Sequence, residues 1–161
     1  MAEFELSSVE KAVKGHLPKA LELSRSLREH PELPDQEFES SGKMVEILKE
    51  AGFEVTYPYA GYETAFHALF DNGDGPEVAI LTEYDALPEI GHGCGHNLHG
   101  SLSILTGLAL KDLKDSYKGK LHVIGTPAEE ENGAKIGMAA QGIFDNMSLA
   151  MMMHSWSGGK C

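Results

Sequence analysis

Two stretches near the start of the chain place their apolar residues at helical spacing. From residue 3 to residue 29 the pattern predicts an amphipathic helix, which Pro18 interrupts. The segment HPELPDQEF then breaks the periodicity, and a second amphipathic stretch ends at Gly52, since glycine is typical of helix C-termini. The apolar face of this second stretch comprises Met44, Val45, Leu48 and Ala51. The chain is therefore expected to begin with two helices.

Apolar runs of strand length follow the two helical stretches. FEVTY and TAFHALF predict two strands, and the turn signal DNGDG closes the second. The next three runs are almost continuously apolar, as in strands covered on both faces: EVAILTEY, KLHVIGT and LAMMM. In the last run, residues Met151 to Met153 are interpreted as core residues.

Helical patterns alternate with these strands. The leucine spacing from Leu98 to Leu113 predicts a helix, with Asn97 available to cap its N-terminus, and AKIGMAAQGIF predicts a shorter one. Strands that alternate with helices form βαβ units, whose strands run parallel. The sequence therefore predicts an α/β fold with a mostly parallel central sheet and helices on both faces.

Length and charge narrow the classes of protein that fit this pattern. The 161 residues suit a single domain large enough to bury a core. With 13 basic and 25 acidic side chains the net charge is -12, which argues against nucleic acid or an anionic membrane as a partner. No apolar run approaches the roughly 18 residues that span a bilayer, and the polar start MAEFELSSVEK does not read as a secretory signal. Two cysteines form no disulfide framework, so a reduced, cytoplasmic protein is expected.

Each of the three apolar runs leads into polar residues of an unusual kind. The first ends in Glu83 and Asp85 and precedes a loop, EIGHGCGHNLHG, that contains one cysteine and three histidines. The second run leads into consecutive glutamates and the third into a histidine: Glu129, Glu130, Glu131 and His154. Because ligands bind outside the carboxyl ends of parallel strands, these thiol, imidazole and carboxylate groups are expected to converge at one edge of the sheet.

The Cys/His loop, residues 89–100, has three chemical interpretations. A structural zinc site needs four nitrogen or sulfur ligands, usually as two close pairs, and the only other cysteine is Cys161. A nucleophilic Cys94 needs a nearby base, which the histidines could supply, but this leaves the glutamates without a role. A catalytic metal centre accounts for both, because a mixed thiolate, imidazole and carboxylate set suits zinc or a similar ion. Cys94 and His96 can face the same way in an extended segment, and the glycines around them let the backbone bend.

The glutamate run and His154 each have a plainer interpretation. Acidic residues favour the first turn of a helix, so EEEN on its own fits a solvated helix start. Beside a metal ion, one carboxylate can bind the ion while its neighbour takes a proton from metal-bound water, which requires a base within about 3 Å. A lone histidine is usually a packed, partly buried residue. The position of His154 directly after the third run is what makes it a candidate ligand.

Taken together, these motifs resemble the M20 family of metallopeptidases and amidohydrolases. The resemblance runs from about Leu27 to the end of the chain and rests on REHPEL, TEYDALPEIGHGCGHNLHG, GTPAEEENGAKIGM and MMMHSW, in that order and spacing. It is closest to the aminoacylase and carboxypeptidase-like branch. It implies a zinc-exopeptidase-like catalytic domain that hydrolyses amide bonds of N-acyl amino acids or small dipeptides. It also implies two divalent metal ions, with zinc as the first choice and manganese or cobalt as alternatives.

The resemblance implies roles for individual residues. Cys94 corresponds to a ligand that bridges the two ions, and Glu129 to the general base that deprotonates the attacking water. Asp85 corresponds to an acidic residue that orients a ligand from close range, whereas His92 and His99 match the motif without an assigned role. The terminal ligands correspond to His96, Glu130 and His154.

Members of this family are considerably longer than the present chain. They carry an inserted lid or dimerisation domain and a final metal-binding histidine near the C-terminus. The resemblance therefore implies that residues 1–161 form a partial catalytic domain, and that the full-length form is a homo-oligomer. Hydrolysis of a small-molecule amide or dipeptide is the expected function. The alternative, from a different class, is a non-catalytic metal-binding or interaction domain that retains the fold.

Overall fold

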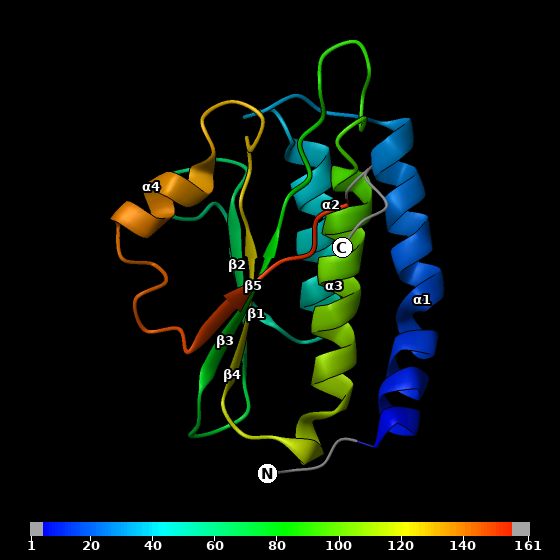
Figure 1. Ribbon diagram of the computed structural model, residues 1–161, viewed down its shortest axis with the longest axis vertical. Helices are drawn as coiled ribbons and strands as arrows, with labels where there is room; N and C mark the ends of the chain where they lie inside the picture. The colour runs from blue at the N-terminus through cyan, green and yellow to red at the C-terminus, as the bar shows by residue number, and fades with distance from the viewer. Residues whose placement is uncertain (1–4, 156–161) are drawn as a thin grey trace.

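The computed structural model describes residues 5–155, which fold into a sheet with helices on both faces (Figure 1). Within this range, three longer helices lie on one face of a five-stranded sheet, and one short helix lies on the other. The helical elements are α1 (Leu6–Glu29), α2 (Phe38–Glu50), α3 (His96–Asp112), the 3-10 turn η1 (Lys114–Ser116) and α4 (Ala134–Ala140). Among residues 5–155, no helix has both the length and the apolar character needed to cross a membrane.

The sheet is mixed, and its parallel part is the part that the sequence predicted. Its strands are β1 (Glu54–Thr56), β2 (Phe66–Asp71), β3 (Glu77–Thr82), β4 (Lys120–Gly125) and β5 (Leu149–Met151), in the spatial order β1-β2-β4-β3-β5. β3 runs parallel to both β4 and β5, so the three strands that precede the polar clusters lie side by side with their carboxyl ends together. β1 and β2 join this group through antiparallel pairings.

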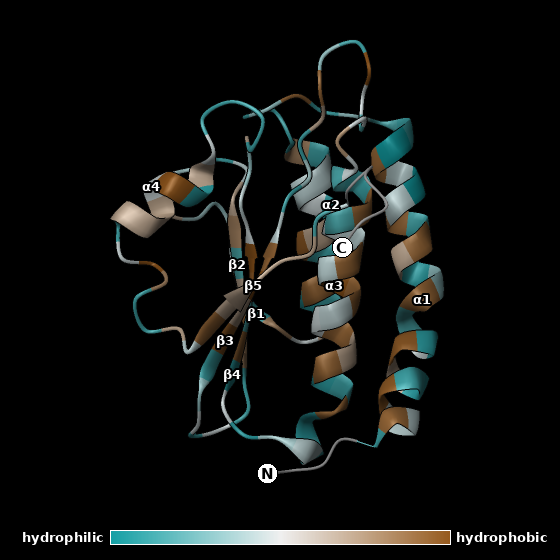
Figure 2. Ribbon diagram, viewed as in Figure 1, coloured by the Kyte–Doolittle hydropathy of each residue, from teal (hydrophilic) through white to brown (hydrophobic). Residues whose placement is uncertain are grey.

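The core lies between the sheet and the three longer helices. α3 packs directly on β3 and β4, and α1 packs on the outer side of α3. Because α3 is covered from two directions, it is apolar around much of its surface, whereas α1 alternates between apolar and polar faces (Figure 2). The largest core side chains here include Phe66, Tyr84, Ile104 and Val123. A smaller cluster, on the other face of the sheet, is formed with α4 by Ala65, Ala79, Ile124, Ala134 and Met138.

Two local predictions about the helices are wrong. α1 continues through Pro18, which is exposed, so the carbonyl group that loses its helical partner can bond to water. Asn97 does not cap α3, because the helix begins at His96 and Gly95 is the N-cap residue. The buried side-chain amide of Asn97 instead donates hydrogen bonds to the carbonyl and hydroxyl oxygens of Ser24 in α1. Asn97 therefore ties two helices together.

The interpretation of Met151 to Met153 as core residues is also wrong. These side chains are 50%, 37% and 58% exposed. Among the described residues β5 has a single neighbouring strand, β3, and therefore forms an edge of the sheet. Apolar composition predicts a strand, but it does not predict how many neighbours the strand has.

Candidate metal centre

The loops that follow β3 and β4 rise from the same end of the sheet, and α3 begins beside them (Figure 1). This arrangement follows from the parallel pairing, because neighbouring parallel strands present their carboxyl ends at one edge. His154 follows β5 at the same edge, and the centroid of its ring lies 5.7 Å from that of His96. The predicted convergence of the three polar clusters is therefore confirmed.

His96 lies at the centre of the convergent residues. Its side chain is fully buried, and its Nε2 atom lies 3.5 Å from Glu83 Oε2. The same nitrogen lies 3.7 Å from Glu129 Oε2 and 4.0 Å from Glu130 Oε1. Carboxylates from the ends of two strands thus surround one imidazole nitrogen.

The other ring nitrogen of His96 faces Asp85. His96 Nδ1 lies 2.9 Å from the backbone carbonyl oxygen of Asp85 and 3.0 Å from its Oδ1 atom. Because both neighbours accept hydrogen bonds, the proton of a neutral His96 resides on Nδ1 and the lone pair on Nε2. Asp85 Oδ2 also accepts a hydrogen bond of 2.9 Å from the backbone N–H of Glu130. Asp85 therefore orients His96 and anchors the glutamate loop at once.

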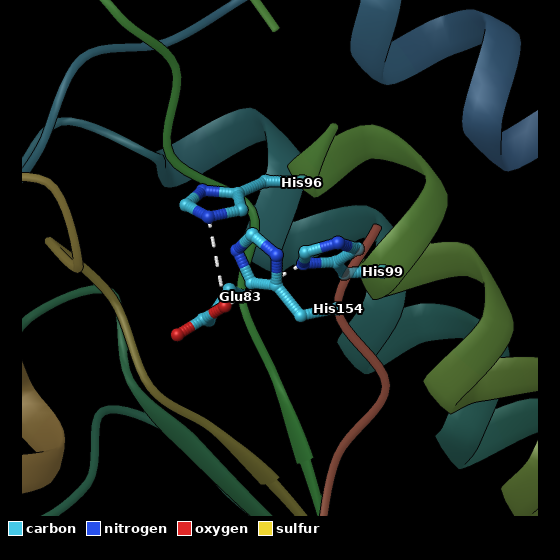
Figure 3. A group of neighbouring side chains, drawn as sticks. All are labelled: Glu83, His96, His99 and His154. Atoms are coloured by element: carbon cyan, nitrogen blue, oxygen red, sulfur yellow. Dashed lines mark ion pairs between the residues drawn. The ribbon is translucent and has the colours of Figure 1, made fainter. Parts of the chain in front are cut away.

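Two groups of side chains bring their ligand atoms within 4.8 Å of one another. The first consists of Cys94, His96 and Glu130. The second consists of Glu83, His96, His99 and His154, which converge from the end of β3, from α3 and from the segment after β5 (Figure 3). All four residues predicted as metal ligands thus belong to these groups, and His96 belongs to both.

Gly95 brings Cys94 and His96 together. Its φ angle of 89° lies in the left-handed region that glycine adopts without steric cost. The chain turns there from the loop into α3, so Cys94 and His96 are not neighbours on an extended segment as predicted. The role predicted for the glycines is confirmed at this position.

Glu83 and His99 belong to the centre although the sequence motifs gave them no ligand role. Glu83 is 1% exposed, and its Oε2 atom lies 3.5 Å from His99 Nδ1. Two sequence signals could have identified them. Glu83 precedes Asp85 by two residues at the end of a strand, and His99 follows His96 by three residues on one helix face. Lys135, from α4 on the opposite face of the sheet, donates a hydrogen bond to Glu83 Oε1.

The centre carries a negative electrostatic potential. Burial disfavours the ionised form of Glu83, but contacts with His99 and Lys135 outweigh it and hold the pKa of this carboxyl group at about 2. Burial likewise disfavours protonated His96, yet Asp85 and Cys94 beside it raise the pKa of this imidazole to about 11. Neighbouring anions thus stabilise positive charge at His96 despite its burial. The same field favours a bound cation.

Several buried polar atoms fit a metal ion because they have no hydrogen-bond partner among the described residues. They are Glu83 Oε2, His96 Nε2 and His99 Nδ1, together with Asp85 Oδ1. Buried side-chain polar atoms are nearly always paired in folded proteins, and the first three of these atoms converge on one region. Sulfur, nitrogen and oxygen donors together suit zinc or a similar borderline divalent ion. The residues therefore fit a metal centre.

The sequence of this region matches a known family. The model of Peptidase family M20/M25/M40 matches residues 79–160, which is about half of the chain and includes every residue of the centre. The chain belongs to peptidase family M20/M25/M40. The resemblance seen in the sequence motifs is thereby confirmed.

Individual members of the M20 family agree with this assignment. The chain is 36% identical to the Xaa-Arg dipeptidase of Mus musculus over 145 residues, which cover 82% of this chain and 34% of that protein. It is 31% identical to a p-aminobenzoyl-glutamate hydrolase of Escherichia coli K12, covering 91% of this chain and 34% of that protein. A crystal structure from Bacillus subtilis, described as a dinuclear metal-binding peptidase from the M20 family, matches with a TM-score of 0.78 at 30% identity. That match covers 89% of this chain and 44% of the Bacillus subtilis chain. The chain thus spans about a third of the length of these two curated relatives.

Proposed function

We propose that this chain supplies the metal centre of a hydrolase that cleaves the amide bond of N-acyl amino acids or small dipeptides. The observation that carries the proposal is the meeting of Cys94, His96 and Glu130 within 4.8 Å, with a second carboxylate, Glu129, beside the same imidazole. A thiolate, an imidazole and a carboxylate form a ligand set, and the adjacent carboxylate is placed to move a proton. Residues 1–161 then form part of a catalytic domain.

Each predicted ligand has a place in this scheme. Two divalent ions, with zinc as the first choice, would polarise the scissile carbonyl group and lower the pKa of a bound water. Cys94 bridges the ions, and three residues each bind one of them: His96, Glu130 and His154. The thiolate and the carboxylate offset part of the positive charge that two cations bring into a partly buried site. A thiol ligand also suits a reducing, cytoplasmic setting.

Glu129 and Asp85 act on protons and on orientation. Glu129 is 35% exposed on its side chain, so it can reach both the imidazole and incoming water. It accepts the proton of the attacking water and returns it to the departing amine. Asp85 holds the Nδ1–H of His96, which keeps the Nε2 lone pair directed into the centre.

The substrate class is supported by the relatives. One of them is named as a dipeptidase and another as a hydrolase of p-aminobenzoyl-glutamate. We infer that the substrates of this protein are likewise small amides, and that a full-length form is a homo-oligomer. Nucleic acid and membrane surfaces do not fit as partners of a chain with a net charge of -12.

The assay that tests this function measures amide hydrolysis directly. N-acetyl amino acids and Xaa-Arg dipeptides should be offered to this chain and to a form extended to the length of its relatives, with zinc, manganese or cobalt. Turnover by the extended form that disappears with a chelator is the expected result. Metal binding without turnover by either form would instead favour a metal-binding or interaction domain that retains the fold.

Thiol chemistry provides a test of Cys94 that does not depend on turnover. Metal coordination deprotonates a cysteine and shields its sulfur from alkylation. A thiol reagent should therefore modify Cys94 slowly in the zinc-loaded protein and quickly after chelation, as measured by peptide mass mapping. Cys161, which lies outside the described residues, serves as the second thiol for comparison. Equal labelling of both cysteines before chelation would contradict ligation by Cys94.

A further inference from the structure

Glu37 is a buried carboxylate that has no part in the scheme above. Its exposed fraction is 0%, and it lies at the boundary between the α1–α2 connection and α2. Its Oε1 atom accepts a hydrogen bond of 2.8 Å from the backbone N–H of Ala128, and its Oε2 atom accepts one of 2.9 Å from Thr64 Oγ1. No cationic side chain among residues 5–155 forms an ion pair with it. Burying a carboxyl group without a counter-ion is costly, so the group must do something for the fold or for the site.

Ala128, which donates this bond, is the residue directly before Glu129. It is 1% exposed and adopts a φ of 56°, in the left-handed region that disfavours a side chain. Its carbonyl oxygen accepts hydrogen bonds from the backbone N–H groups of Gly133, at 2.7 Å, and Glu131, at 3.3 Å. Ala128 is thus the base of the turn that presents Glu129 and Glu130. Such strained residues persist only where their surroundings hold them.

The two proposed functional glutamates are held from both sides. On one side Glu37 binds the N–H of Ala128, and on the other Asp85 binds the N–H of Glu130 at 2.9 Å. Glu129 lies between the two anchored amide groups. Its direction is therefore fixed by backbone bonds to two buried carboxylates, neither of which contacts its side chain in the hydrogen bonds of the described residues.

The α1–α2 connection also contacts the other loop of the centre. The backbone N–H of Ala86, next to Asp85, donates a hydrogen bond of 2.8 Å to the carbonyl oxygen of Glu32. The side chain of Glu32 accepts bonds from the backbone N–H groups of Glu39 and Ser40 at the start of α2, where a carboxylate is favoured. One connection, residues 30–37, is thereby fixed to α2 and to both loops that carry candidate ligands.

We propose that Glu37 is a positioning residue, which holds the turn at Ala128 so that Glu129 and Glu130 point into the metal centre. This inference rests on the roles proposed for the two glutamates. Glu37 acts through the peptide group of Ala128 and touches neither metal nor substrate. What the turn requires from residue 37 is a hydrogen-bond acceptor of the right length inside the protein.

Two substitutions separate this role from a general contribution to stability. Glu37→Gln keeps the length and the acceptor oxygen, and its amide group can donate to Thr64 Oγ1. Glu37→Leu keeps a similar volume but leaves the buried N–H of Ala128 without a partner. Leu48→Ala is the matched control, because Leu48 is fully buried in the core between the sheet and the longer helices, a cluster to which no residue of the turn belongs. It should lower Tm without altering the geometry of the centre.

The experiment measures zinc affinity by competition with a chromophoric chelator, and kcat and KM in the intact protein, well below the lowest Tm of the set. Glu37→Leu is expected to weaken zinc binding and to lower kcat by roughly 10–100-fold each, the usual cost of losing support around a metal ligand. Glu37→Gln should stay within about threefold of the parent, and Leu48→Ala should match the parent in both quantities. Wild-type affinity and kcat in Glu37→Leu would overturn the proposal, as would equal losses in the Gln and Leu variants. Because zinc affinity is measured without substrate, it reports on Glu37 even if none of the proposed amides is hydrolysed.

Discussion

Replacement of Glu129 by glutamine is expected to lower kcat of the intact protein by roughly 10²–10⁴, which is the usual contribution of a positioned acid–base group. The amide of Glu129→Gln keeps the shape of the side chain but cannot accept the proton of the attacking water. KM should change little, because the lost interaction belongs mainly to the transition state. Metal content should remain close to that of the parent, since Glu129 is proposed to contact water rather than an ion. Steady-state kinetics and metal analysis of the purified variant measure both expectations.

The neighbouring residue provides the control for this experiment. Glu130→Ala removes a proposed ligand whose carboxylate meets Cys94 and His96 within 4.8 Å, so it should lower the metal content of the protein. If Glu129→Gln loses the metal and Glu130→Ala retains it, the two roles are exchanged. If neither variant changes metal content or rate, the glutamate run is an acidic turn without a catalytic role.

Replacement of His96 by alanine is expected to weaken metal binding more than any other single substitution in the centre. His96 is the residue that the two candidate ligand groups share. Substituting residues that only support a ligand costs about 10–100-fold in metal affinity. Loss of a proposed ligand that belongs to both groups should therefore cost roughly 10²-fold or more. Equilibrium dialysis against a zinc buffer measures the affinity.

His16→Ala is the matched control for His96→Ala. His16 Nε2 lies 2.8 Å from Asp112 Oδ2 at the surface between α1 and α3, so this variant removes an imidazole far from the centre. Its zinc affinity should equal that of the parent. Retention of full zinc affinity by His96→Ala would mean that the ion binds elsewhere.

The strands and their order of chemistry could be predicted from sequence because they depend on local composition and on one topological rule. Apolar runs identified β3, β4 and β5, and parallel pairing then placed the residues after them at one edge. Cys94, His96, Glu130 and His154 were found in this way and do converge. The antiparallel addition of β1 and β2 was not predicted, because strand composition does not encode the direction of the neighbouring strand.

The residues that sequence reasoning missed depend on contacts across the fold. Glu37 lies 91 positions before Ala128 along the chain, yet it bonds to the turn that presents Glu129. No local pattern distinguishes this buried carboxylate from the exposed acidic residues around it. The exposure of Met151 to Met153 was missed for the same reason, because burial depends on which elements lie alongside a strand.

The hydrogen bond between His96 and Asp85 has a consequence for the order in which metal ions load. With Nδ1 directed at Asp85, the ring has a single lone pair to offer, on Nε2, and one lone pair serves one ion. The two groups of ligands that include His96 therefore compete for it. Whichever ion takes this nitrogen leaves the other with a smaller ligand set. The stepwise stability constants of the first and second ions should accordingly differ, so that loading is sequential and a singly loaded species accumulates at intermediate metal concentrations.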